Sequence, residues 1–147
     1  MGSVNKSSVN QKILENIAAL IPDTININLF DNLTTLPHFN PFETINNPPA
    51  SVIDFRERIQ QADGVIICMP EYVFSIPAIL KNAIEGCVAT TVFSDKPVGL
   101  ITASTSGVKG REQLKLIMNT LTATTISPCF CGSPKPTSIY CLMNGAK

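Results

Sequence analysis

The chain has 147 residues, of which eleven are basic and eleven acidic, so it carries no net charge. Without a basic excess, neither nucleic acid nor an anionic membrane surface is expected as a partner, and a small-molecule ligand is favoured. The length suits one domain, residues 1–147, and no apolar stretch reaches the ~18 residues of a membrane span, so we expect a cytoplasmic protein.

The first predicted element is a helix that begins near Ser8, because apolar residues between positions 13 and 21 recur at helical spacing. Residues 24–29 alternate polar and apolar side chains, which predicts a strand near a sheet edge. Residues 30–49 are rich in Pro and Asn and predict a long connection. A helix is then predicted from Ser51, which with Asp54 resembles a capping box. Its apolar face comprises Val52, Phe55, Ile59 and Ala62.

Residues 65–69 are a continuous apolar run, as in a parallel strand covered by helices on both faces, so this strand is expected at the sheet centre. Pro70 ends the strand, since proline cannot donate to the ladder. Pro77 suits the first turn of the next helix. The mostly apolar stripe of that helix comprises Ala78, Ile79, Leu80, Ala83, Ile84 and Val88.

Residues 98–103 are a second candidate for a buried strand, and residues 104–110 form a loop that contains glycine. A further helix is predicted from the spacing of Leu114, Ile117, Met118 and Leu121. Beyond residue 122 the pattern weakens, and residues 139–143 are favoured as the last strand. The alternation of strands and helices predicts an α/β domain with a parallel sheet.

The cysteines predict reduced thiols rather than a disulfide framework, because their number is odd and Cys68 lies inside a predicted buried strand. Cys129 and Cys131 are separated by one residue, and the single histidine, His38, is far away in sequence. No metal site is therefore predicted.

Three loops are expected at the carboxyl edge of the sheet, where parallel sheets bind their ligands. The first loop carries Ser3, Asn5 and Ser8 before a helix, where free N–H groups favour an anion, although such residues also cap helices without any ligand. In the second loop, Tyr72 and Phe74 could border a planar ring, with backbone N–H groups at its polar edge. The alternative is that both aromatics are core or subunit-interface residues. Glu71 could likewise be a structural carboxylate that pairs a cation or caps the next helix.

Three segments, Pro70-Glu71-Tyr72, Phe74-Ser75-Ile76-Pro77 and Leu80-Lys81-Asn82-Ala83, resemble the flavin-loop signature of the NADPH-dependent FMN reductase family, which includes quinone and azo-dye reductases. Gly2-Ser3 with Ser8 and Asn10 resembles its phosphate loop. Leu36-Pro37, Phe39-Asn40-Pro41 and Glu43 resemble the stretch after its second strand, and Lys96-Pro97-Val98-Gly99 and Ala103-Ser104 also agree. The resemblance covers most of residues 2–121 and implies a flavodoxin-like three-layer sandwich.

The resemblance implies an oxidoreductase that passes a hydride from NAD(P)H through FMN to an electron acceptor such as FMN or a quinone, with no catalytic side chain and no metal. It also implies a homodimer or homotetramer that uses the helix after Pro77. The implied cofactor-binding residues are Ser3, Asn5, Ser8, Val9, Asn10, Pro70, Glu71, Tyr72, Val73, Phe74, Ser104, Thr105 and Gly107. A flavodoxin-like binding domain without turnover is the alternative, and a fragment that folds only as an oligomer is a third reading.

The sequence also departs from the family pattern. Asn5 stands where the family usually has arginine, which predicts weaker FMN binding, and Val73, Ala78 and Gly86 replace a usual asparagine, glycine and aromatic residue. The family's first strand, which lies between its second and third strands in the order 2-1-3-4-5, is not found before Gly2. Its final helix is not found either, and residues 122–147 match poorly. We expect a split sheet unless strand exchange, association or a rearranged sheet compensates.

Overall fold

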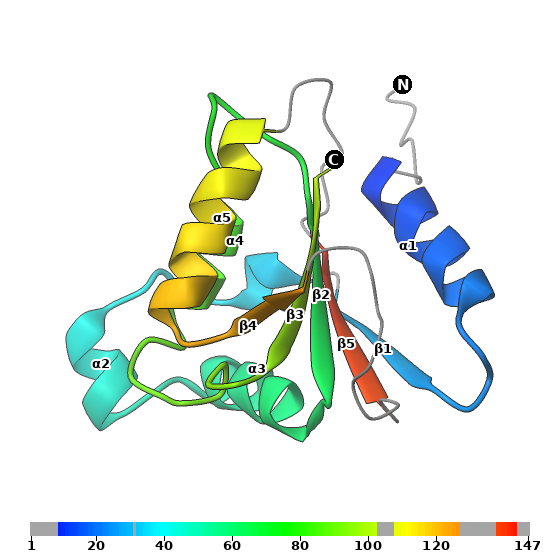
Figure 1. Cartoon of the computed structure of the whole chain (residues 1–147). Coiled ribbons are helices and arrows are strands. Elements are labelled where there is room, and N and C mark those ends of the chain that lie inside the picture. The colour runs from blue at the N-terminus through cyan, green and yellow to red at the C-terminus, as the bar shows by residue number, and fades with distance from the viewer. Residues whose placement is uncertain (1–8, 31, 103–107, 127–137, 144–147) are drawn as a thin grey trace, which may run out of the picture.

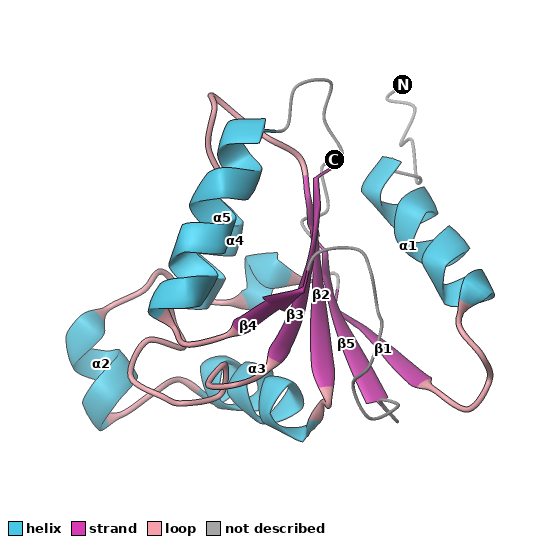
Figure 2. Ribbon diagram, viewed as in Figure 1, coloured by secondary structure: helices cyan, strands magenta, loops and turns pink. Residues whose placement is uncertain are grey.

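The computed structural model describes residues 9–30, 32–102, 108–126 and 138–143, which form a parallel sheet with helices on both faces (Figures 1 and 2). The predicted α/β class and parallel sheet are confirmed. None of the described helices is long and apolar enough to cross a bilayer. The elements are α1 (Val9–Leu20), β1 (Asn26–Phe30), the short 3-10 helix η1 (Leu33–Thr35), α2 (Pro41–Asn46), α3 (Ala50–Gln61), β2 (Gly64–Met69), α4 (Ala78–Glu85), β3 (Pro97–Thr102), α5 (Val108–Thr120), β4 (Thr124–Ile126) and β5 (Ser138–Met143).

The strand order is β1-β5-β2-β3-β4, so β5 lies between β1 and β2 and runs parallel to both. Ile139 is opposite Ile27 of β1 and Gly64 of β2, and Leu142 is opposite Phe30 and Ile67. The sheet is therefore not split at this place, and of the three compensations that the sequence analysis allowed, the structure shows a rearranged sheet. Since successive residues of a central parallel strand bond to opposite neighbours, β5 pairs the backbone groups that β1 and β2 turn toward each other. The sheet is rearranged rather than interrupted.

A proline in the middle of β5 tests this position. The substitution Cys141→Pro removes a backbone N–H that a central strand donates to its neighbour. We expect the free energy of unfolding, measured by urea denaturation with circular dichroism, to fall by roughly 3 kcal/mol or more. The control Cys141→Ala keeps this N–H and should lower the free energy of unfolding by much less. Equal stability of Cys141→Pro and the wild type would contradict a central β5.

Two helix starts differ from expectation. Helix α3 begins at Ala50, and its first N–H groups, those of Val52 and Ile53, donate to the carbonyl of Pro49. The predicted capping box is wrong, because Ser51 lies inside the first turn and no side chain caps this helix. Helix α5 begins at Val108, so the predicted loop ends earlier than residue 110.

The connection over residues 30–49 is also more ordered than predicted, since it contains η1 and α2. The Asn40 side chain accepts a hydrogen bond from the N–H of Phe42 at 3.0 Å, and Pro41 occupies the first turn of α2. Asn followed by Pro is a standard helix start, so the signal for α2 was present in the sequence.

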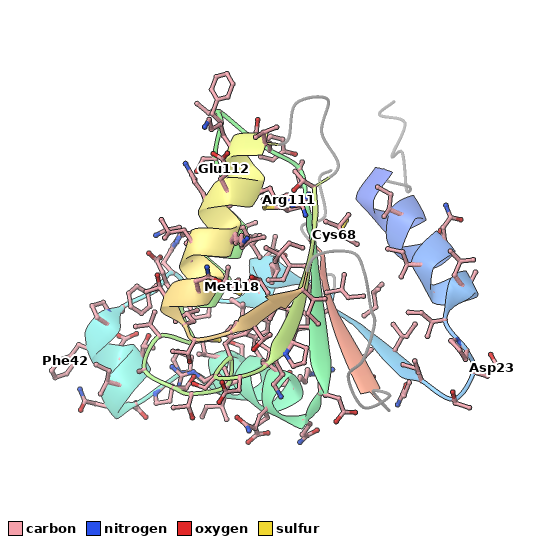
Figure 3. All side chains as sticks on the ribbon, in the orientation of Figure 1. Asp23, Phe42, Cys68, Arg111, Glu112 and Met118 are labelled. Carbon is pink, nitrogen blue, oxygen red and sulfur yellow. The ribbon has the colours of Figure 1, made fainter. Side chains whose placement is uncertain are left out.

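The two faces of the sheet are buried to different degrees. On β2, Val65, Ile67 and Met69 face the larger core under α3, α4 and α5, whereas Cys68 faces α1. Figure 3 shows Met118 reaching from α5 toward the sheet, and Cys68 on the side of α1. Apart from Cys68, the α1 side consists of partly buried isoleucines: Ile13, Ile17, Ile21, Ile25, Ile27, Ile66 and Ile101. The prediction that β2 is apolar toward both faces is confirmed.

Arg56 ties α3 to the end of α4. Its Nε and Nη2 donate to the carbonyl of Gly86 at 2.8 and 2.6 Å, and Nη2 also donates to the carbonyl of Thr44 at 3.1 Å. Next to Gly86, the thiol of Cys87 is buried. Burial raises the pKa of Cys87 from 9.0 to about 12, and the nearby charge of Arg56 opposes this shift only in part.

Stability should therefore depend on the Cys87 thiol at alkaline pH. The native state keeps the proton up to about pH 12, whereas the unfolded chain releases it from about pH 9. Because the unfolded state then binds fewer protons, the free energy of unfolding should fall with a limiting slope of about 1.4 kcal/mol per pH unit above pH 9.

Urea denaturation of the wild type and of Cys87→Ala between pH 7 and 10.5 isolates this effect. The difference between the two proteins should be constant up to about pH 8.5 and then shrink. Lys96, whose pKa is lowered by burial against the opposing charge of Asp63, is present in both proteins and cancels. A difference that stays constant over the whole range would refute the buried-thiol explanation.

Candidate functional site

The chain leaves β2 through a tight turn. After Pro70, the N–H of Tyr72 donates to the carbonyl of Ser75 at 3.0 Å, and the N–H of Ser75 donates back to Tyr72 at 2.9 Å. The two residues between them, Val73 and Phe74, have positive φ angles of 51° and 57°. Two central residues with positive φ are the mark of a type I′ turn.

The turn presents its apolar side chains to the outside. Val73 is 95% exposed, Phe74 70% and Tyr72 48%. The alternative that Tyr72 and Phe74 are core residues is therefore wrong for this chain. The N–H groups of Val73 and Phe74 donate to no other described residue, so the turn offers two backbone donors beside two exposed rings. A flat molecule with a polar edge has the matching chemistry.

Val73 is strained in this conformation, because a β-branched residue at positive φ crowds its own backbone. Asparagine tolerates this region, so Val73→Asn should raise the free energy of unfolding by about 1 kcal/mol. Thermal denaturation measures this as a higher melting midpoint. Val88→Asn replaces an exposed valine whose φ is not positive and should give no such gain. An unchanged or lower midpoint for Val73→Asn would refute the strain.

The first two turns of α5 hold both ends of the turn. Before the turn, Oε2 of Glu71 accepts a hydrogen bond from the N–H of Gly110 at 2.7 Å. After the turn, Oγ of Ser75 donates to Oε1 of Gln113 at 2.7 Å, and Nε2 of Gln113 donates to the carbonyl of Phe74 at 3.4 Å. Glu71 therefore has a structural bond, as its alternative interpretation proposed, but the helix whose start it bonds is α5 and not the next helix, α4.

Thr102 is a polar residue at this edge that the sequence analysis missed. It is the last residue of β3, and its side-chain oxygen is buried without a hydrogen-bond partner among the residues that the structure describes. An unsatisfied buried hydroxyl is unfavourable. A ligand atom at the carboxyl end of β3 would satisfy it. The available signal was the position of Thr102 near the end of a predicted buried strand.

The predicted site residues are distributed as follows. The segment from Pro70 to Phe74 lies together at the carboxyl end of β2, and the backbones of Val9 and Asn10 open α1. Figure 1 shows the first turns of α1 and α5 at this same end of the sheet. The predicted residues that lie outside the described part of the chain are Ser3, Asn5, Ser8, Ser104, Thr105 and Gly107.

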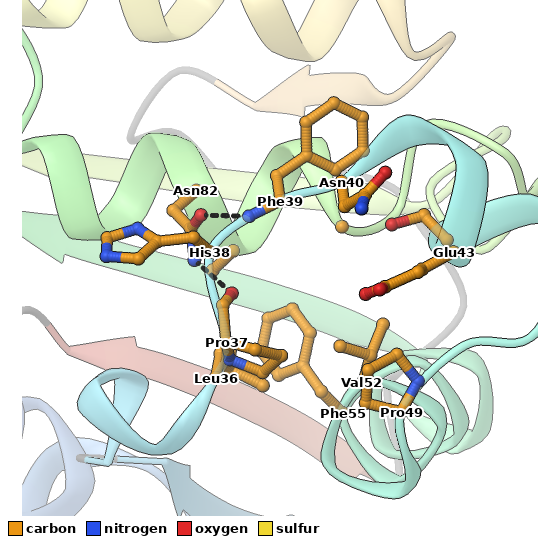
Figure 4. A pocket seen from close by; sticks show the side chains of 13 residues that line it. Leu36, Pro37, His38, Phe39, Asn40, Glu43, Pro49, Val52, Phe55 and Asn82 are labelled. Atoms are coloured by element: carbon orange, nitrogen blue, oxygen red, sulfur yellow. Dashed lines mark hydrogen bonds between the residues drawn. The ribbon is translucent and has the colours of Figure 1, made fainter.

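Asn82 belongs to the same signature but has a different role. Its Oδ1 accepts a hydrogen bond from the N–H of Phe39 at 2.7 Å, and its Nδ2 donates to the carbonyl of Pro37 at 2.9 Å (Figure 4). Both ends of the amide are thus used to hold residues 37–39 against α4. The pocket in Figure 4 lies between this stretch, α2 and α3, and its lining includes none of residues 70–74.

A parallel sheet with helices on both faces and candidate ligand-binding loops at its carboxyl edge is the architecture of the doubly wound α/β proteins, to which the flavodoxin-like class belongs. Within that class, the chain belongs to the NADPH-dependent FMN reductase family, whose sequence profile matches residues 1–137. The resemblance seen in the loop after β2 is thus confirmed over most of the chain.

Individual relatives agree with this assignment. A quinone reductase of Escherichia coli is 34% identical over 113 residues, which are 75% of this chain and 60% of that protein. An NAD(P)H-dependent FMN reductase of Pseudomonas aeruginosa is 33% identical over 105 residues, 70% of this chain and 56% of that protein. The solved structure of a flavoenzyme NAD(P)H:(acceptor) oxidoreductase from Paracoccus denitrificans has a TM-score of 0.74 at 26% identity and covers 86% of this chain and 72% of that one. The chain spans about 60% of the length of the first of these relatives.

Proposed function

We propose that the chain is an FMN-dependent NAD(P)H oxidoreductase whose flavin lies at the carboxyl edge of the sheet. The observation that carries this proposal is the exposed turn at residues 72–75, with two aromatic rings and two backbone N–H groups that bond to no described residue. Family membership and the activities named for the relatives support it. FMN supplies the hydride chemistry when bound, and the protein supplies binding and orientation.

The residues present fit such a ligand. Tyr72 and Phe74 would border the ring system, and the N–H groups of Val73 and Phe74 would donate to its polar edge. The buried hydroxyl of Thr102 would gain a partner. The start of α1 would receive the phosphate, because free N–H groups and the helix dipole favour an anion there.

The remaining residues are assigned from the family pattern. Ser3, Ser8 and Asn10 would hold the phosphate with the start of α1. Ser104, Thr105 and Gly107 would approach the flavin from the loop after β3. Asn5 supplies no positive charge, so the phosphate contact would be weaker than one that includes an arginine. The acceptor of this reaction would be FMN, a quinone or a similar molecule.

An FMN titration tests the proposal. Flavin fluorescence should be quenched in a saturable manner by the purified chain, and absorbance at 340 nm should fall when NADH or NADPH and a quinone are added. The absence of both the quenching and the fall in absorbance would refute the proposal. Quenching without oxidation of either nicotinamide would instead support a flavin-binding domain without turnover, which the neutral Asn5 favours.

Replacing an exposed aromatic residue of the turn tests where the flavin binds. Tyr72→Ala should weaken FMN binding by roughly three- to tenfold, because it removes one aromatic contact. Phe42→Ala is a matched control, since Phe42 is also an exposed aromatic but lies on α2, at the other end of the molecule (Figure 3). Fluorescence titration measures both. Equal affinity of Tyr72→Ala and the wild type would place the flavin elsewhere.

A further inference from the structure

Helix α5 approaches the turn at residues 72–75 unusually closely at Gly110. A Cβ atom at this position would lie 3.2 Å from Cγ of Glu71 and 3.3 Å from the carbonyl oxygen of Ser75. Both distances are shorter than ordinary van der Waals contacts. Glycine is a poor helix former, yet Gly110 lies in the first turn of α5. The close approach of the turn explains why glycine occupies this helical position.

The contacts of α5 bracket the turn from both sides. Glu71 precedes the two residues with positive φ and bonds to the N–H of Gly110, whereas Ser75 follows them and bonds to Gln113. A strained backbone persists only where its surroundings hold it. The two antiparallel hydrogen bonds between Tyr72 and Ser75 close the turn itself, but the bonds to α5 fix its orientation on the molecule.

From this arrangement we propose that Gly110 and Gln113 are positioning residues for the flavin. The start of α5 holds residues 71–75 in the conformation in which Tyr72, Val73 and Phe74 receive the ring. Neither Gly110 nor Gln113 needs to touch the ligand. This inference rests on the proposed function, but the anchoring of the turn can be measured without any ligand.

The first test inserts one methyl group. Gly110→Ala should push Glu71 and Ser75 away and weaken FMN binding by roughly tenfold, which is the effect of losing one well-placed hydrogen bond. Alanine is the better helix former, which offsets part of the cost of these close contacts, so the protein should still fold and its melting midpoint should fall only slightly. Gly99→Ala is the matched control, since a Cβ there would meet Ile66 at an ordinary 3.6 Å. Its FMN affinity should equal that of the wild type.

The second test removes bonds without adding volume, and it serves if Gly110→Ala fails to fold. Gln113→Ala loses both the acceptor for Ser75 and the donor to Phe74, so FMN binding should weaken roughly threefold to tenfold. Gln113→Glu keeps the acceptor and should restore part of the affinity. Lys115→Ala, an exposed position on the same helix, should bind FMN as the wild type does.

Hydrogen exchange without FMN provides the independent measurement. The N–H groups of Tyr72 and Ser75 should exchange several-fold faster in Gly110→Ala and Gln113→Ala than in the wild type, because the turn is less firmly held. Unchanged FMN affinity in both variants would overturn the proposal. If the wild type binds no FMN, the proposed function fails. In that case faster exchange still supports α5 as the anchor, and unchanged exchange overturns the anchor as well.

Discussion

The candidate site depends on the pairing of β5 with β1 on one side and β2 on the other. Without that pairing, β2 would be an edge strand with unpaired backbone groups, and the turn that follows it would extend from a frayed end. With β5 in place, β2 is paired on both sides and apolar toward both faces. Its carboxyl end is then a rigid point from which the turn at residues 72–75 projects.

Some of this fold could be predicted from the sequence. Strands β2 and β3 were located within one residue, because each is an apolar run bounded by proline or glycine. The position of β5 could not be derived in the same way. An apolar run indicates that a strand exists, but its neighbours are determined by backbone groups elsewhere that need a partner. Strand β4 was missed because three residues are too few to show a period.

The candidate site was likewise predictable only in part. Residue types and their order identified the loop after β2, since aromatics between two prolines at a strand end are a local pattern. The contacts between this loop and helix α5 could not be predicted from the sequence. Gly107 and Gly110 both suggested a loop, yet Gly110 lies in helix α5, where the close approach of Glu71 and Ser75 explains the glycine. The type I′ geometry was also hidden, since Val73 is a poor residue for positive φ. The local conformational preference of a residue does not determine its conformation where contacts with another element favour a different one.

The place of β5 in the sheet has a consequence for the order of folding. Strand β5 comes after every other described strand in the sequence, but it pairs at the middle of the sheet. During synthesis, β1 and β2 therefore emerge from the ribosome before the strand that joins them. Contacts between residues so distant in sequence slow folding, because a long loop must close before they can form. The backbone groups of β1 and β2 that β5 pairs lack that partner during this interval, and unpaired strand edges of this kind favour aggregation of a nascent chain.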